Sequence, residues 1–511
     1  MWNRGFFDLY ESHLAKAKLG GGEERLRKLR RAGKLTARER LELLFDANTF
    51  HEIGMFVESR AVELGMEKKH FPGDGVVTGY GMVDGCLVFA SSQDFTVCGG
   101  SGGEEHLNKI CRIHDMAVAA RAPFVSINES GGARIEEGIC ALDGYSKLFY
   151  RNTQASGVIP QIAVILGNCA GGASYSPALC DFIFMLRGKS QMYITGPQVI
   201  KAVTGKMVGM EELGGAHVHA QESGQAHFIY DNEENCLAGT RTLLKFLLKS
   251  QVDEISRPPD PEVHKIQDIV PEDQRRAYNV RNIIETIVDA NSFFEVSSEF
   301  AKNIVVGFVR IQGRSVGLIA NQPNFLGGAL ECNAADKAAR FIRFCDCFNI
   351  PLLTLVDVPG FLPGLDQEHR GILRHGSKLL YAYSEATVPK ITLIMRKAYG
   401  GAYCAMCGKG LGADIVYAWP IAEIAVMGAE GAVNVVYRKR LNESSQPDQE
   451  RKNLIDDYER QFLNPYYAAQ RGFIDEVIRP EETRSKIEAA LQCLENKSQN
   501  PLIKKHGNIP L

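Results

Sequence analysis

The residues best placed to do chemistry in this 511-residue chain are glycines that follow apolar segments. Glycines at a strand-to-helix turn let the backbone approach a ligand and direct free amides at it. Two amides about 3 Å from one oxygen form an oxyanion hole, which stabilises a developing enolate. Tight packing is the alternative role of such glycines. Four segments have this form: VSINESGGARI (125–135), AVILGNCAGGASYS (163–176), LTLVDVPGFLPG (353–364) and LIMRKAYGGAYCAM (393–406).

Side chains with nucleophilic or metal-binding chemistry are less convincing. The run GGSGG at 99–103 fits the GxSxG pattern of a hydrolase nucleophile, but no histidine partner is apparent for Ser101. Cys404 and Cys407 form a single CxxC pair, which we interpret as packing because a second pair and a thioredoxin-like context are both missing. The sequence contains no HExxH, Walker A or helix-opening GxGxxG motif.

Three acidic residues, Glu129, Glu136 and Glu137, flank the first Gly-Gly turn. They could act as general acids or bases, although residues in such positions more often cap or solvate the following helix. The sequence therefore offers two backbone oxyanion holes and no convincing side-chain base. Chemistry of this kind stabilises two enolate-like species and takes its base from a substrate or a cofactor.

The elements that must position these turns alternate along the chain. From residue 75 onward, strand-like runs at 86–90, 124–127 and 162–166 alternate with helical stretches, which predicts an α/β architecture with crossover helices. The preceding residues look helical and charged, and Thr36 with Glu39 forms a capping box there. We interpret the basic run 25–40 as a solvated helix face, with docking of an anionic ligand as the alternative.

The pattern of the first half returns in the second half. RAPFVSINESGG is echoed by NIPLLTLVDVPG, and CAGGASYS is echoed by AYGGAYCA. Several matches in order at a nearly fixed offset indicate an internal duplication. A proline-rich stretch at 251–273 lies at the midpoint of the chain, and we interpret it as a linker. We therefore predict two domains, 1–255 and 256–511.

Composition narrows the class of protein. With 58 Lys+Arg against 61 Asp+Glu the formal net charge is −3, which excludes a generally cationic nucleic-acid binder. No apolar run reaches the roughly 18 residues of a membrane span, and 13 scattered cysteines favour a reducing compartment. We expect a cytoplasmic protein, or one of the mitochondrial matrix if the source is eukaryotic. Asp8 and Glu11 near the start are atypical of a transit peptide.

Longer blocks make the chain similar to a known family. They include SQDFTVCGGSGG, SINESGGARIEEG, ELGGAHVHAQESGQAHF, RFIRFCDCFNIPLLTLVDVPGFLPG and KHGNIPL. These blocks resemble the carboxyltransferase (beta) subunits of biotin-dependent acyl-CoA carboxylases, and most closely those of propionyl-CoA carboxylases. The resemblance implies an α/β fold of two tandem crotonase-like (ClpP/crotonase) ββα-superhelix domains, the N-terminal one for acyl-CoA and the C-terminal one for biotin. It also implies a homo-oligomer, either a dimer or a hexamer (a trimer of dimers).

The resemblance further implies a reaction and its residues. Carboxybiotin releases CO2, the biotin ureido nitrogen takes the α-proton of propionyl-CoA or a similar acyl-CoA, and the enolate attacks CO2. Gly171 and Gly172 look like the amides that hold the thioester enolate, and Gly401 and Ala402 like those that hold the ureido oxygen. The CoA side is expected to comprise Ser130, Gly131, Gly132, Ala133, Arg134 and Ala170. The biotin side and acyl pocket are expected to comprise Val358, Pro359, Gly360, Phe361, Tyr399, Gly400 and Cys404.

Departures from the family pattern shape the expected partners and alternatives. Propionyl-type members usually carry an acidic residue where this chain has Cys404, so the preferred acyl group stays open. The chain has no MKM biotinylation site and no ATP-grasp region, so we expect the biotin carboxylase and the biotin carboxyl carrier on a separate alpha chain. A four-Cys zinc ribbon is also absent, and we expect no metal.

Three alternatives remain from the sequence. The first is the carboxyltransferase (alpha) subunit of a biotin-dependent, sodium-pumping methylmalonyl-CoA or glutaconyl-CoA decarboxylase. The second is a crotonase-type hydratase or isomerase that uses Glu129 or Glu137 as its base. The third is a non-catalytic scaffold that holds other carboxylase subunits.

Overall fold

The chain forms two compact units, Met1–Val252 and Asp253–Leu511. The structure is a computed structural model, and it describes residues 4–248, 258, 266–499 and 502–511. The predicted boundary at 255/256 and most of the predicted linker 251–273 lie outside these described residues. Within the described ranges, every helix is too short or too polar to cross a bilayer.

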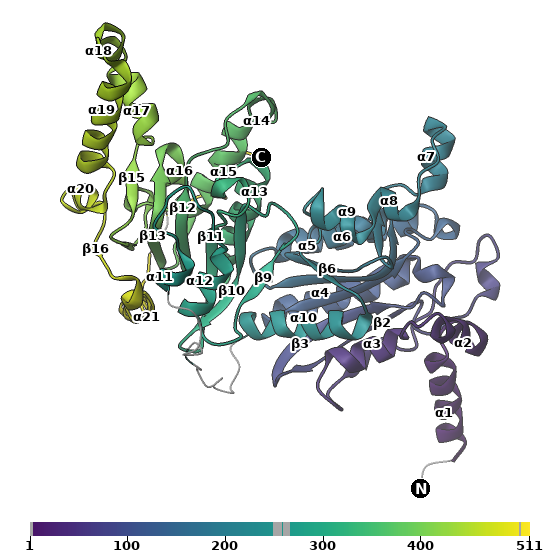
Figure 1. Cartoon of the computed structure of the whole chain (residues 1–511). Helices are drawn as coiled ribbons and strands as arrows, with labels where there is room; N and C mark the ends of the chain where they lie inside the picture. Colours follow the sequence, from purple (N-terminus) through teal and green to yellow (C-terminus); the bar gives the residue numbers. More distant parts are fainter. Residues whose placement is uncertain (1–3, 249–257, 259–265, 500–501) are drawn as a thin grey trace. The chain divides into compact units, whose positions relative to one another are not determined.

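The first unit is built on an eight-stranded sheet (Figure 1). Its strands are β1 (His51–Ile53), β2 (Val76–Val83), β3 (Cys86–Gln93), β4 (Phe124–Ser130), β5 (Gln161–Ala170), β6 (Phe182–Leu186), β7 (Gln191–Tyr193) and β8 (Phe228–Tyr230). β1, β2 and β3 pair antiparallel, whereas β3, β4, β5, β6 and β8 follow one another in parallel. β7 pairs in parallel with the end of β5.

Parallel neighbours require crossover connections, and helices supply them here. α4 (Glu104–Ala120) joins β3 to β4, α5 (Ile139–Ala155) joins β4 to β5, and α6 (Gly172–Ala178) follows β5. The other helices of this unit are α1 (Arg4–Lys18), α2 (Glu23–Arg31), α3 (Ala37–Leu44), α7 (Pro197–Thr204), α8 (Met210–Gly214), α9 (Ala216–Gln221) and α10 (Glu233–Leu247). The predicted capping box is confirmed at the start of α3, where Thr36 and Glu39 bond each other's backbone amides.

The core of the first unit fixes the ends of its central strands. Every residue of β4 is buried, as expected for a parallel strand covered on both faces. Leu107 of α4 and Leu148 of α5 pack with Phe124 and Ile165 of the sheet. Fully burying a side chain of this size contributes about 1.5–3 kcal/mol. The turns that leave β4 and β5 therefore start from a rigid base.

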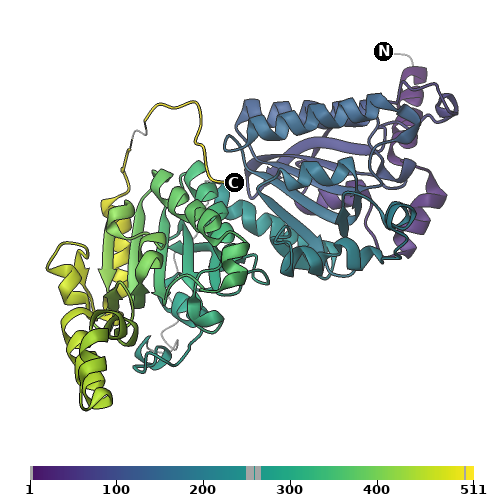
Figure 2. The ribbon, with the colours of Figure 1, turned by 90° about the horizontal axis from the view of Figure 1, so that it is seen from above.

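The second unit repeats this arrangement (Figure 2). Its strands are β9 (Phe294–Val296), β10 (Ile304–Ile311), β11 (Arg314–Asn321), β12 (Leu352–Val358), β13 (Lys390–Tyr399), β14 (Ile415–Ala418), β15 (Glu423–Ala425) and β16 (Glu476–Val477). They follow the same order as β1 to β8, with β15 beside the end of β13. The register shift between Asn128 and Ser130 of β4 recurs between Val356 and Val358 of β12. The predicted α/β fold with two related halves is confirmed.

Side chains confirm the duplication at places where the sequence pattern carried no signal. Arg241 of α10 donates to Asp46 at 2.7 Å, and Arg484 of α21 (Thr483–Cys493) donates to Asp289 at 2.6 Å. The spacing along the chain from Asp46 to Asp289 equals that from Arg241 to Arg484. The two halves therefore share ion pairs as well as strands.

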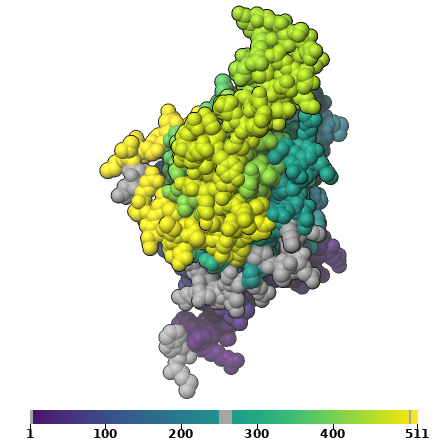
Figure 3. Space-filling model, turned by 60° about the vertical axis from the view of Figure 1, so that its left-hand side comes forward, coloured from purple at the N-terminus to yellow at the C-terminus, as the bar shows by residue number. Residues whose placement is uncertain are grey.

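The second unit contains ten further α-helices among the described residues. They are α11 (Ile266–Ile269), α12 (Val280–Ile287), α13 (Cys332–Cys347), α14 (Leu365–His369), α15 (Ile372–Glu385), α16 (Gly400–Ala405), α17 (Ala429–Val436), α18 (Arg438–Glu443), α19 (Pro447–Phe462) and α20 (Pro465–Ala469). Helices α17 to α19 form a projecting lobe, yellow-green in Figure 3. Val433, Leu441 and Leu454 give this lobe a small core of its own.

Candidate active site

The first predicted turn follows β4 and approaches the end of β5. The amide of Gly131 donates to Gly99 O at 3.0 Å, and the amide of Gly132 donates to the Ser130 hydroxyl at 3.1 Å. Gly132 has φ +103°, and a Cβ there would lie only 2.9 Å from Ala170 O. Glycine is needed at this position both for its positive φ and for the close approach of the two turns.

The second turn joins β5 to α6, and one of its two expected amides is already used. Gly171 has φ +58°, and its N–H donates to Tyr193 O at 3.0 Å. Helix α6 begins at Gly172, and the first amides of a helix have no partner within the helix. The amides that the turn leaves available to a ligand are therefore those of Gly172 and Ala173.

The equivalent turn of the second unit joins β13 to α16. Gly400 has φ +57°, close to that of Gly171. If these two glycines are aligned, Gly401 and Ala402 correspond to Gly172 and Ala173. Gly401 is exposed and Ala402 is buried. The duplication thus makes Gly401 and Ala402 equivalent to Gly172 and Ala173, and not to the predicted pair Gly171 and Gly172.

The residues predicted for the biotin side lie at the ends of two neighbouring strands of the second unit. The Tyr399 hydroxyl donates to Glu423, and burial together with that carboxylate raises the pKa of Tyr399. Gly360 has φ +146° at the end of β12, between buried Val358 and half-buried Phe361, while Pro359 is exposed. The structure therefore places all of these residues at the carboxyl ends of β12 and β13.

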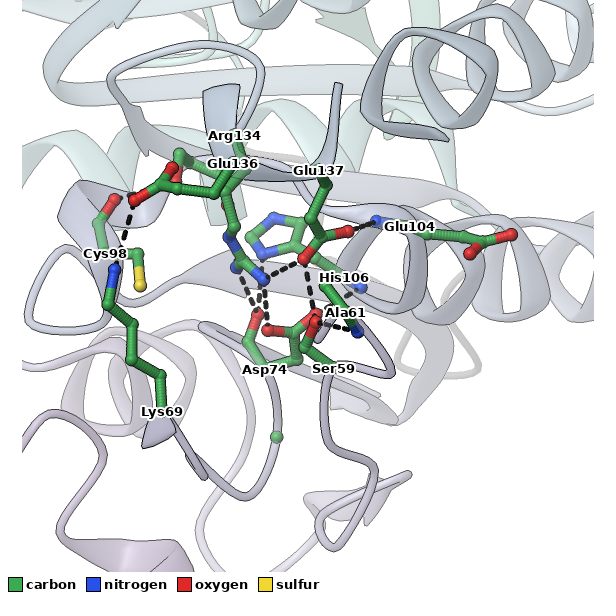
Figure 4. Close-up of polar contacts among 12 residues, drawn as sticks. Ser59, Ala61, Lys69, Asp74, Cys98, Glu104, His106, Arg134, Glu136 and Glu137 are labelled. Carbon is green, nitrogen blue, oxygen red and sulfur yellow. Dashed lines mark hydrogen bonds and ion pairs between the residues drawn. The ribbon is translucent and has the colours of Figure 1, made fainter. Parts of the chain in front are cut away.

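Arg134 is buried, and polar contacts hold its guanidinium group (Figure 4). Its side chain is 1% exposed and donates to Asp74 at 2.6 Å, to Glu137 at 2.8 Å and to Ser101 O at 3.0 Å. Burial raises the pKa of Asp74 although Arg134 opposes that shift. Arg134 therefore orients its loop through both terminal nitrogens, and its Nε, which has no partner, is buried.

The acidic residues around the first turn are engaged in the same way. Glu137 also accepts from the Ser59 hydroxyl at 2.8 Å and from the Glu104 amide at 2.7 Å (Figure 4). Glu136 accepts from Lys69 at 3.1 Å. Carboxylates whose oxygens already accept such bonds are poor candidates for a free base.

Glu129 lies just before the first turn and closes a buried charge network. It accepts from Lys34 and from Arg40, the latter at 2.8 Å, and Arg40 also donates to Glu233 at 2.8 Å. Arg40 is 1% exposed, so the prediction that the whole basic run 25–40 is a solvated face is wrong at this residue. The sequence pattern missed the partner because Glu233 lies 193 residues away.

The two motifs with nucleophilic patterns have local structural roles. The Ser101 hydroxyl donates to Cys98 O at 2.8 Å and thereby closes its own turn. Cys407 is buried, and burial raises its pKa to about 12, whereas Cys404 is exposed on α16. In the described part of the chain, no group of His, Cys, Asp and Glu side chains could hold a metal ion.

Tyr145 of α5 supports the site but carries no signal in the sequence. Its hydroxyl donates to Gly132 O at 3.2 Å. A Cβ on Gly172 would lie 3.0 Å from its ring, and a Cβ on Gly102 would lie 2.8 Å from its hydroxyl. One buried aromatic side chain thus underlies both turns, and it was indistinguishable from any other apolar-face residue of a helix.

The fold and the site define a two-unit α/β enzyme with equivalent main-chain amides in each unit. The model of the carboxyl transferase domain matches residues 28–509. The chain is 54% identical to the carboxyltransferase subunit of propionyl-CoA carboxylase from Haloferax mediterranei, covering 96% of each chain. It is 53% identical to methylmalonyl-CoA decarboxylase subunit alpha from Veillonella parvula, covering 99% and 98%.

A solved structure agrees with these relatives. The transcarboxylase 12S structure, described as a hexamer with methylmalonyl-coenzyme A and methylmalonic acid bound, has a TM-score of 0.95 and 51% identity, covering 99% of this chain and 98% of that one. The chain therefore belongs to the carboxyl transferase domain family. The family resemblance found in the sequence is confirmed.

Proposed function

We propose that the protein is the carboxyltransferase subunit of a biotin-dependent acyl-CoA carboxylase, and that it transfers CO2 from carboxybiotin to the α-carbon of propionyl-CoA to give methylmalonyl-CoA. One observation carries the proposal: each unit presents an equivalent pair of main-chain amides, Gly172 with Ala173 and Gly401 with Ala402, at the end of a buried strand. The relatives named above, with their printed activities, support it.

The amides of the first unit suit a thioester enolate. Removing the α-proton of an acyl-CoA moves negative charge onto the thioester oxygen, and preorganised amides stabilise that charge. Gly172 and Ala173 lie at the turn beside Gly132, and Tyr145 contacts both turns. Loop 130–134 provides the CoA side, in which Arg134 orients the backbone and does not touch the ligand.

The amides of the second unit suit the ureido oxygen of biotin. Gly401 is exposed at the start of α16, so an acceptor oxygen can reach its N–H from solvent. When bound, biotin supplies the CO2 and the base that accepts the α-proton. That source of a base fits a site whose own carboxylates, Glu129 and Glu137, are engaged in ion pairs.

Cys404 is the residue that we assign to the acyl pocket. It is exposed on α16, and it is small and apolar where propionyl-type members usually carry an acid. We expect the pocket lined by Cys404 to accept a short unbranched acyl chain. The thirteen cysteines, scattered singly along the chain, support a reducing, cytoplasmic location. We further propose a homohexamer that works with a separate biotin carboxylase and carrier chain.

A second candidate function is favoured by the printed activity of two relatives. Methylmalonyl-CoA decarboxylase subunit alpha from Veillonella parvula is 53% identical to this chain. A decarboxylase subunit would run the same transfer from methylmalonyl-CoA to biotin with the same amides. The partner chain separates the two functions, because a carboxylase needs an ATP-dependent biotin carboxylase and a sodium pump needs a membrane subunit.

The purified chain should transfer carboxylate between acyl-CoA and free biotin. Formation of the carboxylated acyl-CoA from acetyl-, propionyl-, butyryl- and crotonyl-CoA is measured with carboxybiotin as donor. Propionyl-CoA should give the highest kcat/KM. A G401V variant should lose transfer while its oligomer persists in gel filtration. Biotin-independent exchange of the α-proton would support the hydratase alternative, and absence of transfer by the purified wild-type chain would support the scaffold. An unchanged rate in G401V would contradict the role of the Gly401 amide.

A further inference from the structure

Two buried lysines occupy equivalent places in the two units. Lys109 lies on α4 and Lys337 on α13, and the spacing between them along the chain equals that between Gly132 and Gly360. The lysines are 5% and 7% exposed. No motif marked either of them in the sequence, and the proposed reaction uses neither.

Both ammonium groups donate hydrogen bonds to main-chain carbonyl oxygens. Lys109 donates to Gly73 O at 2.8 Å and to Val76 O at 2.5 Å. Lys337 donates to Phe300 O at 2.7 Å and to Ile304 O at 2.9 Å. A buried charge is costly unless such bonds compensate it. Each lysine thereby fixes the turn that enters the second strand of its sheet, β2 or β10.

Burial weakens the charge of both groups, and nearby carboxylates oppose that effect. Burial lowers the pKa of Lys109 to about 8, while Glu52 and Asp74 raise it and Arg38 lowers it further. Burial lowers the pKa of Lys337 to about 7. There Glu295 and Glu331 raise the pKa, and Arg281 lowers it. Glu295 follows Glu52 by the same number of residues as Arg281 follows Arg38, whereas Asp74 and Glu331 are not equivalent in the two units.

The two turns hold equivalent carbonyls with different side chains. In the first unit, Asp74 of the turn binds Arg134, whose other nitrogen donates to Ser101 O at 3.0 Å. In the second unit, Asn303 of the turn donates directly to Ala329 O at 2.7 Å. Ala329 follows Ser101 at the same spacing as Lys337 follows Lys109, so it is the duplicate of that residue.

The residues that follow Ser101 and Ala329 each donate a hydrogen bond to a glycine of the candidate site. Gly102 N donates to Gly132 O at 2.9 Å, and Leu330 N donates to Gly360 O at 3.0 Å. A continuous set of contacts therefore runs from each ammonium, through its turn and one side-chain donor, to the glycine turn of the same unit. Both halves of the duplication contain this path even though the intermediate side chains differ.

We propose that Lys109 and Lys337 are paired positioning residues, each of which holds the ligand-binding turn of its own unit in register. This inference rests on the proposed function, in which the first unit binds acyl-CoA and the second binds biotin. It extends that function, because it assigns each lysine to one substrate only.

The test measures KM for each substrate in the full-length K109M and K337M enzymes. Methionine keeps the length of the side chain and removes the charge and its hydrogen bonds. K109M should raise KM for acyl-CoA about tenfold and leave KM for carboxybiotin within about twofold, and K337M should do the reverse; tenfold corresponds to about 1.4 kcal/mol. K147M, which changes a half-exposed lysine on α5, is the matched control and should change neither KM.

A purely structural role would give a different result. Loss of folded enzyme lowers kcat and leaves both KM values unchanged, and a general loosening raises both together; either result overturns the inference. If the methionine variants do not fold, K109R and K337R decide, and each should show a one-sided shift of about threefold. Absence of any transfer in the wild-type chain would instead refute the proposed function.

Discussion

Replacing Gly171 with alanine tests whether the backbone of the β5–α6 turn carries the reaction. Gly171 has φ +58° and ψ −129°, a conformation that residues with a side chain rarely adopt. The nearest neighbour of an added Cβ would be Ile194 O at 3.7 Å, which is ordinary contact. The substitution therefore acts through backbone strain of about 1–3 kcal/mol and not through collision.

The strain should cost far more activity than stability. The turn can relieve it by rotating the peptide between residues 171 and 172, which redirects the Gly172 amide. Losing one oxyanion-hole donor lowers kcat by about 10²–10³-fold. The free energy of unfolding can fall by no more than the strain itself, about 1–3 kcal/mol. KM for acyl-CoA should change little, because the loss is confined to the charged transition state.

The assay is carboxyl transfer from carboxybiotin to propionyl-CoA under saturating conditions, with urea unfolding in parallel. G85A is the matched control, since Gly85 has φ +77°, has no atom within 4 Å of an added Cβ, and lies in the β2–β3 hairpin at the opposite end of the sheet. It should lose similar stability and keep its kcat. A G171A enzyme with kcat within about threefold of wild type would refute the assignment of the Gly172 amide.

Three further predictions concern buried groups. Burial lowers the pKa of His106 to about 3, so the unfolded chain binds a proton that the folded chain does not, and unfolding should become easier as pH falls from about 6.5 toward 3, by up to about 4 kcal/mol. Urea unfolding of H106Q should show a flatter pH dependence, and an unchanged slope would assign the effect elsewhere. R40M leaves two buried carboxylates without this partner and should lower the free energy of unfolding by about 3–5 kcal/mol; a loss below about 1 kcal/mol would mean that solvent reaches the site. Y145F removes the bond to Gly132 O and should raise KM for acyl-CoA about threefold, whereas an unaltered KM would show that the ring alone supports the turn.

Local patterns in the sequence were sufficient to predict the α/β fold and the positions of the glycine turns. Alternating apolar runs predict the parallel sheets, and the repeated glycines predict special backbone conformations at Gly132, Gly171 and Gly400, all of which have positive φ in the structure. Both signals depend on neighbours within a few residues, because backbone conformation and burial pattern are set locally. The glycine turns accordingly lie at the strand ends where they were predicted.

Those patterns could not predict hydrogen-bond and ion-pair partners that are distant in the sequence. The Gly171 amide is taken by Tyr193 on β7, which moves the available pair to Gly172 and Ala173. Arg40 is paired 89 residues away with Glu129, although its neighbours in sequence mark it as a surface residue. The identity of a hydrogen-bond partner depends on which strands become adjacent, and that adjacency exists only after folding.

The sequence by itself determined the family, the two-fold repetition and the position of the four glycine turns at the ends of β4, β5, β12 and β13, since these follow from residue order and local stereochemistry. The tertiary structure alone decided which amides are free, which carboxylates are already paired, and that Lys109 and Lys337 hold equivalent turns. Those properties depend on hydrogen-bond distances between residues far apart in the chain. Such distances are set by packing, which no stretch of sequence contains.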